Sequence, residues 1–477
     1  MERLSADDEV MLWPDALWPQ EVGAIAILDG GPLLDRDGEV RIDAVRALVE
    51  SRLHLVPRFR QLLFRPGPGL GGPLWIDTPS FDISRHVVVV PLSPPADEAA
   101  LLRAVERLRH RRLDRSRPLW QMALLPGLAG GRVGLFVKVH HSVADGIAAM
   151  AAIGAFLDAE ADGPTAPPLR WRPRPTPTPG QLAVDSVRRH ATRVGHALRP
   201  LGHPLAAAHR VWAAWPAMRD LISRSPAPRT SLNHVVGPGR TLALIRTRLD
   251  EVEQIARTHR ATVNDVLLAA IAGGLRGMLR SRREPVTEVR MDVPVTLRPA
   301  DARARARGNL IGQMIVPLPV DEPGPSARLT RIAAETAVLK LEEHPSMGVL
   351  LHSRLARRAL LKLLDRNPVN VTSADLVGPR VPVYFAGAKV LEVFPVLPLM
   401  GNVSLGVGAL SYAGQLNLGV IADRDAYPDL DIFVASAEQD LERLAEASAV
   451  GTGVPASAGP WSVPGARDVA DAQRTTA

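Results

Sequence analysis

The chain has 477 residues, of which 46% are hydrophobic and 22% charged, so it is long enough for two domains, each with its own apolar core. It contains no cysteine, which excludes disulfides, cysteine-ligated metal centres and a thiol nucleophile. The formal net charge is +7, and all but four of the 57 basic residues are arginine. Such a surface attracts nucleic acid, an anionic membrane or a phosphorylated substrate. An aromatic content of only 4% argues against base stacking, so we expect no nucleic-acid partner.

Two stretches of the sequence indicate where in the cell the protein is found: the beginning of the chain and its longest uncharged stretch. The first residues include acidic side chains and lack the basic, apolar and small-residue order of a signal peptide, so we expect a cytoplasmic protein. Residues 393–422 are numerous enough to cross a bilayer, but prolines and glycines interrupt them, among them Pro395, Pro398, Gly401 and Gly406. We therefore predict buried strands and turns there.

The first third of the chain mixes two hydrophobic periodicities. Residues 87–90 and 133–139 are strand-like, whereas the apolar residues of 99–111 recur at helical spacing. Residues 163–180 are rich in proline and threonine, which is typical of a linker. After the linker, residues 242–248 and 289–295 predict strands, and residues 263–280 and 329–340 predict helices.

These patterns predict an α/β protein of two lobes, each a mixed β-sheet flanked by helices. We expect a first lobe over residues 1–160, a proline-rich linker with a basic helical segment over 161–230, and a second lobe over 231–448. The tail, residues 449–477, is rich in Gly, Pro, Ser and Ala without apolar periodicity, so we expect it to be disordered.

The basic segment, Gln181 to Arg224, holds seven arginines against two aspartates and includes Trp212 and Trp215. Two interpretations stay open. The segment is either a helical excursion packed on the protein with solvated arginines, or an interfacial helix that lies on a membrane surface.

The most informative local pattern is His140-His141, three further residues, and then Asp145-Gly146, directly after the strand at 133–139. Strand alternation points His140 and His141 in opposite directions, so they cannot both chelate one metal ion, and we expect no metal site. A single imidazole at a strand end, with a carboxylate four residues later and a glycine at the turn, suits a general base. His141 is the candidate base.

This arrangement resembles the HHxxxDG motif of acyl-CoA-dependent acyltransferases with the chloramphenicol acetyltransferase-like fold. Further blocks narrow the resemblance to the bacterial wax ester synthase/diacylglycerol acyltransferase family. They occur in family order: Pro57-Arg58-Phe59-Arg60, Trp75, Phe81-Asp82, His86, Pro118-Leu119-Trp120, Thr262-Val263-Asn264-Asp265, Val293-Pro294-Val295, Gly308-Asn309, Gly378-Pro379 and Ser411-Tyr412-Ala413-Gly414.

The resemblance implies the chloramphenicol acetyltransferase-like fold in two lobes, with the active site between them. It also implies transfer of a long-chain acyl group from acyl-CoA to diacylglycerol or a long-chain alcohol, with acyl-CoA as co-substrate and no bound cofactor. No cysteine or Gly-x-Ser-x-Gly elbow is present, so we expect direct attack of the hydroxyl on the thioester with His141 taking the proton. By resemblance Asp145 organises the turn, Gly146 allows the chain reversal, and His140 packs and forms hydrogen bonds.

Three residues of the second lobe are candidates for substrate contact or for oxyanion stabilisation: Asn264, Asp265 and Ser373. Thr262-x-x-Asp265 before an apolar helix is also a plain capping box, which favours a structural role for Asp265. Many relatives resemble Ser-Asn-Val-Pro-Gly-Pro where this chain has Ala374-Asp375-Leu376-Val377-Gly378-Pro379, which we expect to be a loop. A carboxylate there replaces a neutral amide.

Two alternatives to this function remain. One is a condensation-type acyltransferase that takes its acyl group from a carrier protein, and the other is a non-catalytic protein that binds lipid or acyl-CoA. For the acyltransferase we expect peripheral attachment to the inner face of a membrane or to a lipid droplet, because the acceptor is insoluble in water.

Overall fold

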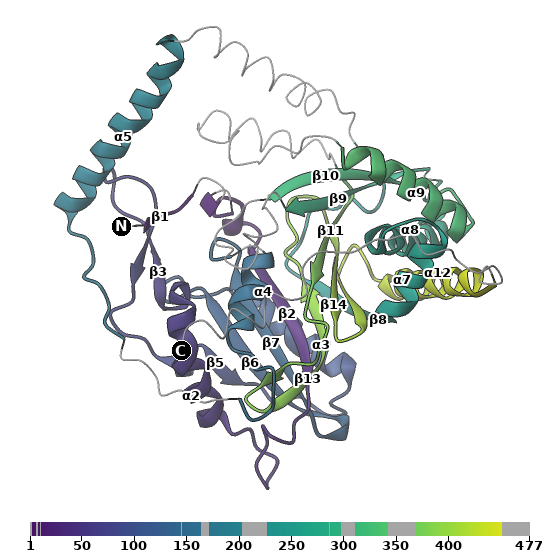
Figure 1. The fold of residues 1–477 in the computed structure, drawn as a ribbon, viewed down its shortest axis with the longest axis horizontal. Coiled ribbons are helices and arrows are strands. Elements are labelled where there is room, and N and C mark those ends of the chain that lie inside the picture. The colour runs from purple at the N-terminus through teal and green to yellow at the C-terminus, as the bar shows by residue number, and fades with distance from the viewer. Residues whose placement is uncertain are drawn as a thin grey trace.

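The computed structural model describes residues 2–5, 8–9, 11–144, 146–163, 171–202, 227–285, 287–296, 311–341 and 369–450 (Figure 1). Within these ranges the strands form two six-stranded sheets and one small sheet of three strands. The protein is therefore a mixed α/β protein with two sheet-based lobes, as the hydrophobic periodicities predict.

The first sheet lies in the lower half of Figure 1. In spatial order its strands are β12 (Tyr384–Phe385), β13 (Ala388–Val396), β2 (Glu21–Leu28), β7 (Arg132–His140), β6 (Trp120–Leu128) and β5 (Val87–Val89). Strand β13 pairs antiparallel with β2, from Val390 opposite Leu28 to Val396 opposite Gly23. Strands from the range expected for the second lobe thus complete the first sheet. Helices α2 (Ile42–Arg52), α3 (Glu98–His110) and α4 (Gly146–Gly154) belong to this lobe.

The second sheet has the order β10 (Ile311–Leu318), β9 (Val289–Thr296), β11 (Val371–Val377), β14 (Leu405–Tyr412), β15 (Gln415–Asp423) and β8 (Arg240–Arg248). Helices α7 (Leu249–Thr258), α8 (Val263–Ser281), α9 (Pro325–Leu339) and α12 (Leu430–Val450) lie together on one side of it (Figure 1). Helix α8 lies within the apolar core between them, because Val266, Leu275 and Met278 are all fully buried. The small sheet joins β1 (Glu2–Arg3), β4 (Leu74–Asp77) and β3 (Gln61–Phe64).

Local sequence explains where the main helices begin and end. Helix α3 starts after Asp97, whose side chain accepts the Ala100 N–H at 2.7 Å, and its last turn carries Arg107 and Arg109 where cations complement the helix dipole. Helix α8 starts with a full capping box formed by Thr262 and Asp265. Both helices match their predicted ranges within two residues at each end.

Two glycines bring the lobes into close contact. A Cβ atom at Gly419 of β15 would lie 2.0 Å from the Pro395 carbonyl oxygen of β13, and one at Gly408 of β14 would lie 2.7 Å from the Pro395 Cβ. No side chain fits at either position, so the second sheet packs directly on strand β13 of the first.

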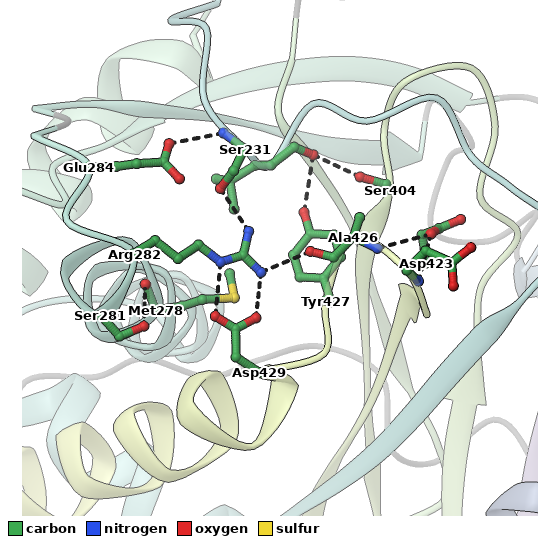
Figure 2. Close-up of polar contacts among 12 residues, drawn as sticks. Ser231, Met278, Ser281, Arg282, Glu284, Ser404, Asp423, Ala426, Tyr427 and Asp429 are labelled. Atoms are coloured by element: carbon green, nitrogen blue, oxygen red, sulfur yellow. Dashed lines mark hydrogen bonds and ion pairs between the residues drawn. The ribbon is translucent and has the colours of Figure 1, made fainter.

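A polar cluster around Arg282 joins three separate segments of the second lobe (Figure 2). The Arg282 guanidinium donates two hydrogen bonds to Asp429, at the start of α12, and one to the Ser231 hydroxyl at 2.7 Å. It also lies over the Tyr427 ring at 5.1 Å. Burial raises the pKa of the Tyr427 hydroxyl, which donates to the Leu232 carbonyl oxygen at 3.0 Å. The cluster fixes the chain that enters the second lobe against α8 and α12.

The structure confirms one of the predictions made from the sequence and contradicts another. Residues 393–422 form the end of β13 and all of β14 and most of β15, as predicted. The prediction of a loop at Ala374 and Asp375 is wrong, because both residues lie in β11, where six consecutive residues pair with β14. Helix α5 (Pro179–Gly202) begins the basic segment, while Trp212, Trp215 and nearly all of the tail lie outside the described residues.

Across the described ranges, no single helix is both long and apolar enough to cross a membrane. Helices α7 and α8 reach that length and composition only when taken together, and they meet at an angle of 96°.

Candidate active site

Strand β7 carries the two histidines to one end of the first sheet. Its residues alternate as predicted: Val137 and Val139 pack in the same core cluster as Trp120, while Phe136 packs on the other face with residues of α3. The strand ends at His140, and His141 occupies the first position of the turn that follows.

The His140 side chain is a buried structural element, with 3% of its surface exposed. Its Nδ1 accepts the backbone N–H of Ser142 at 3.0 Å, which assigns the ring proton to Nε2. Nε2 lies 3.1 Å from Oδ1 of Asp15. The ring is therefore held from both nitrogens and is not available to a substrate.

Asp15 is the partner that fixes this ring, and it lies in a short 3₁₀ helix, Pro14–Ala16. Burial alone would raise the pKa of its carboxyl, but contacts with His140, the backbone N–H of Gln20 and the Arg115 guanidinium together hold it well below the ordinary aspartate range. Asp15 is thus a buried carboxylate that stays ionised next to a histidine.

His141 is held in place by its backbone and is only half-buried. Its N–H donates to the Gln20 carbonyl oxygen at 2.7 Å, which continues the pairing of β7 with β2 by one residue. The side chain is only half-buried, in contrast to that of His140. Of the two histidines, His141 is the more exposed. Asp145 lies outside the described residues, and Gly146 is the first residue of α4.

Helix α4 places this turn against the second lobe. It packs on strand β11, and its Ala148 and Ala149 share a core cluster with Leu376 of β11 and Leu410 of β14. The HHxxxDG turn therefore lies at the junction of the lobes, where the family resemblance places the active site.

The second-lobe candidates differ in how their side chains are used. Asp265 is buried: its Oδ2 accepts from the Thr262 N–H and hydroxyl at 2.8 and 2.7 Å, and its Oδ1 accepts from the Thr336 hydroxyl at 2.7 Å. The contacts with Thr262 belong to the helix cap, and the contact with Thr336 joins the start of α8 to α9, so each of these contacts is structural. Asn264, half-buried in the first turn of α8, makes no side-chain hydrogen bond to any described residue.

Ser373 and Trp120 also have defined surroundings. The Ser373 hydroxyl donates to the Asp292 carbonyl oxygen of β9 at 3.1 Å. Trp120, from the Pro-Leu-Trp block, is buried in an aromatic stack with Phe59 and His86, and its Nε1 donates to the Phe59 carbonyl oxygen at 2.8 Å. It acts as a core anchor directly before the active-site strand.

Two residues that bear on the site were not predicted from the sequence: Asp15, which the structure brings against His140, and Asp292 of β9 in the second lobe. No local pattern links Asp15 to His140, because the contact joins separate segments. Asp292 had a detectable signal: in β9 it alternates with the buried Met291 and Val293, which places its carboxylate, together with Arg290, on the face of the strand opposite the core. Within the ranges described, no group of three His, Asp or Glu residues converges as metal ligands.

Comparison with known protein families bears directly on this site. The model of the wax ester synthase/diacylglycerol acyltransferase catalytic domain matches residues 4–267, and the model of the WS/DGAT C-terminal domain matches residues 307–445. The chain belongs to the wax ester synthase/diacylglycerol acyltransferase family. The HHxxxDG turn lies within the catalytic-domain match, so the resemblance first noted in the motifs extends over most of the chain.

Relatives and solved structures of this family agree. The chain is 31% identical over 435 residues to a probable diacylglycerol O-acyltransferase, tgs1, of Mycobacterium tuberculosis strain H37Rv, covering 89% of this chain and 90% of the relative. A wax ester synthase/diacylglycerol acyltransferase from Marinobacter aquaeolei VT8 shares the fold with a TM-score of 0.66 and 24% identity, over 94% of this chain and all of that one.

The same fold occurs in peptide-synthetase domains. The starter condensation domain of rhizomide synthetase RzmA, in complex with C8-CoA, has a TM-score of 0.57 at 17% identity and covers 94% of this WS/DGAT chain and 95% of that one. The two-lobed fold expected from the HHxxxDG motif is thus confirmed.

Proposed function

We propose that this WS/DGAT protein transfers a long-chain acyl group from acyl-CoA to the hydroxyl of diacylglycerol or a long-chain alcohol, with His141 as general base. The observation that carries the proposal is the contrast between the paired histidines. His140 is buried and held from both ring nitrogens, whereas His141 is partly exposed at the lobe junction. Family membership supplies the reaction class.

In the proposed reaction a ring nitrogen of His141 takes the proton of the acceptor hydroxyl as its oxygen attacks the thioester carbonyl carbon. The tetrahedral intermediate then collapses, the carbon–sulfur bond breaks, and the CoA thiolate takes the proton back from the His141 imidazolium. The products are the ester and CoA, and no covalent acyl-enzyme forms. General-base catalysis of this kind contributes about 10²- to 10⁴-fold.

The remaining motif residues have supporting roles in this proposal. His140, anchored by Asp15, fixes the end of β7, and Gly146 begins α4. Ser373 donates its hydroxyl proton to a backbone carbonyl, so Asn264 is the better of the two candidates for stabilising the oxyanion.

The decisive experiment measures CoA release from palmitoyl-CoA with diacylglycerol, hexadecanol or no acceptor, for wild type and His141→Ala. Acceptor-dependent release that falls at least about 10²-fold in His141→Ala, with an unchanged circular dichroism spectrum, supports the proposal. Absence of release from folded wild type with either acceptor contradicts it. Release only from a carrier-bound acyl group identifies a condensation-type enzyme, and no release from any donor identifies a lipid-binding protein.

We also propose peripheral attachment, from the cytoplasmic side, to a membrane or lipid droplet through helix α5. The helix projects from the body at the upper left of Figure 1. Its base is docked by the buried Leu182 and by Asp185, which accepts from Arg3 at 2.7 Å. On the outward side of this part of the helix, Val184 and Val187 are 70% and 68% exposed, and Arg188 and Arg189 are exposed beside them.

Vesicle flotation tests this attachment. Val184→Glu/Val187→Glu is expected to lower binding to vesicles of phosphatidylcholine with 30% phosphatidylglycerol by about tenfold, because charged side chains replace apolar contact on the lipid-facing surface. Val338→Glu, at an exposed valine of α9, is the matched control and is expected to bind as wild type does. Equal binding by all three proteins would contradict the role of α5.

A further inference from the structure

Strands β9 and β11 form a fork in the second sheet. They pair in parallel only at two positions, Met291 with Val371 and Asp292 with Thr372, although β9 continues to Thr296 and β11 to Val377. Beyond Asp292 the two strands therefore separate, and Figure 1 shows β9 and β10 turning away from β11. Asp292 lies at the point where the fork opens.

The Asp292 side chain points toward the first lobe. Met291 and Val371 belong to the core under the helices, so their neighbours Asp292 and Thr372 lie on the opposite face. On that face a Cβ at Gly406, the β14 partner of Thr372, would lie 3.2 Å from both the Thr372 methyl group and the Leu399 side chain. Leu399 follows β13, the strand that completes the first sheet.

Strand register places Asp292 at the same end of the lobe junction as His141. Strand β13 ends with Val396 opposite Gly23, and β2 starts with Glu21 opposite His140. Leu399 is three residues past Val396, so it lies near the end of the first sheet where the His141 turn begins. Asp292, beside Thr372 and Gly406, faces this same region.

The Asp292 carboxyl is incompletely paired. Its Oδ2 accepts from the Gln313 side-chain amide at 3.4 Å, while Oδ1 is buried and has no hydrogen-bond partner among the described residues. The charged neighbour on its face, Arg290, is engaged with Glu288 at 3.3 Å. The residues that face Asp292 from β10 and β11, Ile315 and Thr372, carry no charge. Burial raises the pKa of Asp292 to about 7, against a smaller opposing effect of the Thr372 hydroxyl.

A buried carboxyl oxygen without a hydrogen-bond partner among the described residues, such as Oδ1 of Asp292, favours a ligand that brings a hydrogen-bonding group. In the proposed reaction the acyl chain brings none, and a long-chain alcohol brings only the hydroxyl that reacts at His141. Diacylglycerol brings two ester groups in addition, a few bonds from its hydroxyl. In its protonated form Asp292 can donate a hydrogen bond to an ester carbonyl oxygen.

We infer that Asp292 is a specificity-determining residue that binds an ester oxygen of diacylglycerol and so distinguishes it from a long-chain alcohol. The inference rests on the acyl transfer proposed above. It names a contact to the acceptor that is separate from the proton transfer at His141.

Acceptor kinetics at saturating palmitoyl-CoA test the inference with two variants. Asp292→Leu is expected to raise the KM for diacylglycerol about tenfold and to change that for hexadecanol less than twofold, because only diacylglycerol loses a hydrogen bond. Asp292→Asn keeps a donor and is expected to stay within threefold of wild type for both acceptors. Hexadecanol activity of each variant shows that it is folded.

The outcomes separate the possible failures. Equal losses of activity with both acceptors would show that Asp292 binds acyl-CoA or supports the fold, and would overturn the inference. An unchanged KM for diacylglycerol in Asp292→Leu would also overturn it. Wild type without acceptor-dependent CoA release would instead overturn the proposed function. Asp375→Asn, which removes a carboxylate from the other face of β11, is the matched control and is expected to use both acceptors normally.

A pH series gives a readout that a merely structural role would not produce. Between pH 6 and 8.5 the wild-type KM for diacylglycerol is expected to rise, because Asp292 loses the proton that it donates as the pH passes about 7. The KM for hexadecanol, and that for diacylglycerol in Asp292→Asn, should not show this rise. A rise that persists in Asp292→Asn would overturn the inference.

Discussion

At the scale of single residues, the pair Asp15 and His140 shows how an ionised group is kept inside the protein to hold a neighbour in place. The carboxylate accepts the Gln20 N–H at 2.8 Å and lies 3.1 Å from the imidazole. His141 is the next residue in the chain, so movement of the His140 ring would displace the proposed base directly.

Asp15→Asn is expected to lower the free energy of unfolding at pH 7 by about 1–3 kcal/mol, because a charged hydrogen-bond acceptor is lost from a buried site. The lowered pKa of Asp15 means that its contribution is present above about pH 4 and is lost as the pH falls toward the folded-state value. The difference between wild type and variant should therefore shrink below about pH 4. Urea unfolding at pH 7, 5 and 3.5 measures it.

The control is Asp43→Asn, at an exposed aspartate whose ion pair with Arg46 spans 3.6 Å, which should change stability by less than about 0.5 kcal/mol. Parallel loss of stability by wild type and Asp15→Asn across this pH range would contradict the assigned ionisation.

At the scale of elements, the start of α8 separates a structural from a catalytic role for Asp265. Asp265→Ala removes the acceptor for three donors, so we expect the free energy of unfolding to fall by about 2 kcal/mol. The kcat of the folded variant should stay within about twofold of wild type. Thermal unfolding and CoA release measure the two quantities, with Thr336→Val as a milder variant that removes one of the three donors.

A large loss of kcat at unchanged stability would instead place Asp265 in the acyl-transfer machinery.

Local sequence predicted the elements well where their contacts are local. The strand at β7 and the helices α3 and α8 follow from periodicity and capping residues, which act over three or four positions. The pairing of β13 with β2 could not be predicted, because an alternating pattern specifies a buried face and not a partner strand. The loop expected at Ala374 and Asp375 failed for the same reason, since the strand there depends on its pairing with β14.

The same limit applies to the site. The HHxxxDG spacing identified His141, because the residues of this motif lie close together in the sequence. The ring that Asp15 fixes and the fork at Asp292 arise from segments far apart in the chain, so only the assembled sheets reveal them.

At the scale of the whole molecule, the two lobes depend on one another through β13. The second sheet packs on Pro395, and ion pairs across the junction add to this contact: Arg246 with Glu392 at 2.9 Å, and Arg424 with Glu106 at 2.7 Å. Since the proposed base lies at the same junction, the relative position of the lobes sets the geometry of the reaction.

Gly419→Ala tests this dependence, because its new Cβ would lie 2.0 Å from the Pro395 backbone oxygen. We expect the free energy of unfolding to fall by about 1–3 kcal/mol and kcat to fall by about 10²-fold as β13 shifts. Gly67→Ala, at an ordinary backbone conformation with open space around the new Cβ, should match wild type in both. A stable and fully active Gly419→Ala would show that the lobe contact tolerates displacement.

The order of strands in the first sheet also has a consequence for synthesis on the ribosome. Strand β2 ends at Leu28, but its neighbour β13 starts only at Ala388. At typical elongation rates the nascent chain therefore carries an open, hydrogen-bonding strand edge for roughly 20 to 70 seconds before its partner emerges. During that interval the edge is exposed to pairing with other chains. Yield of active protein should thus depend on translation speed and on chaperones that shield nascent chains.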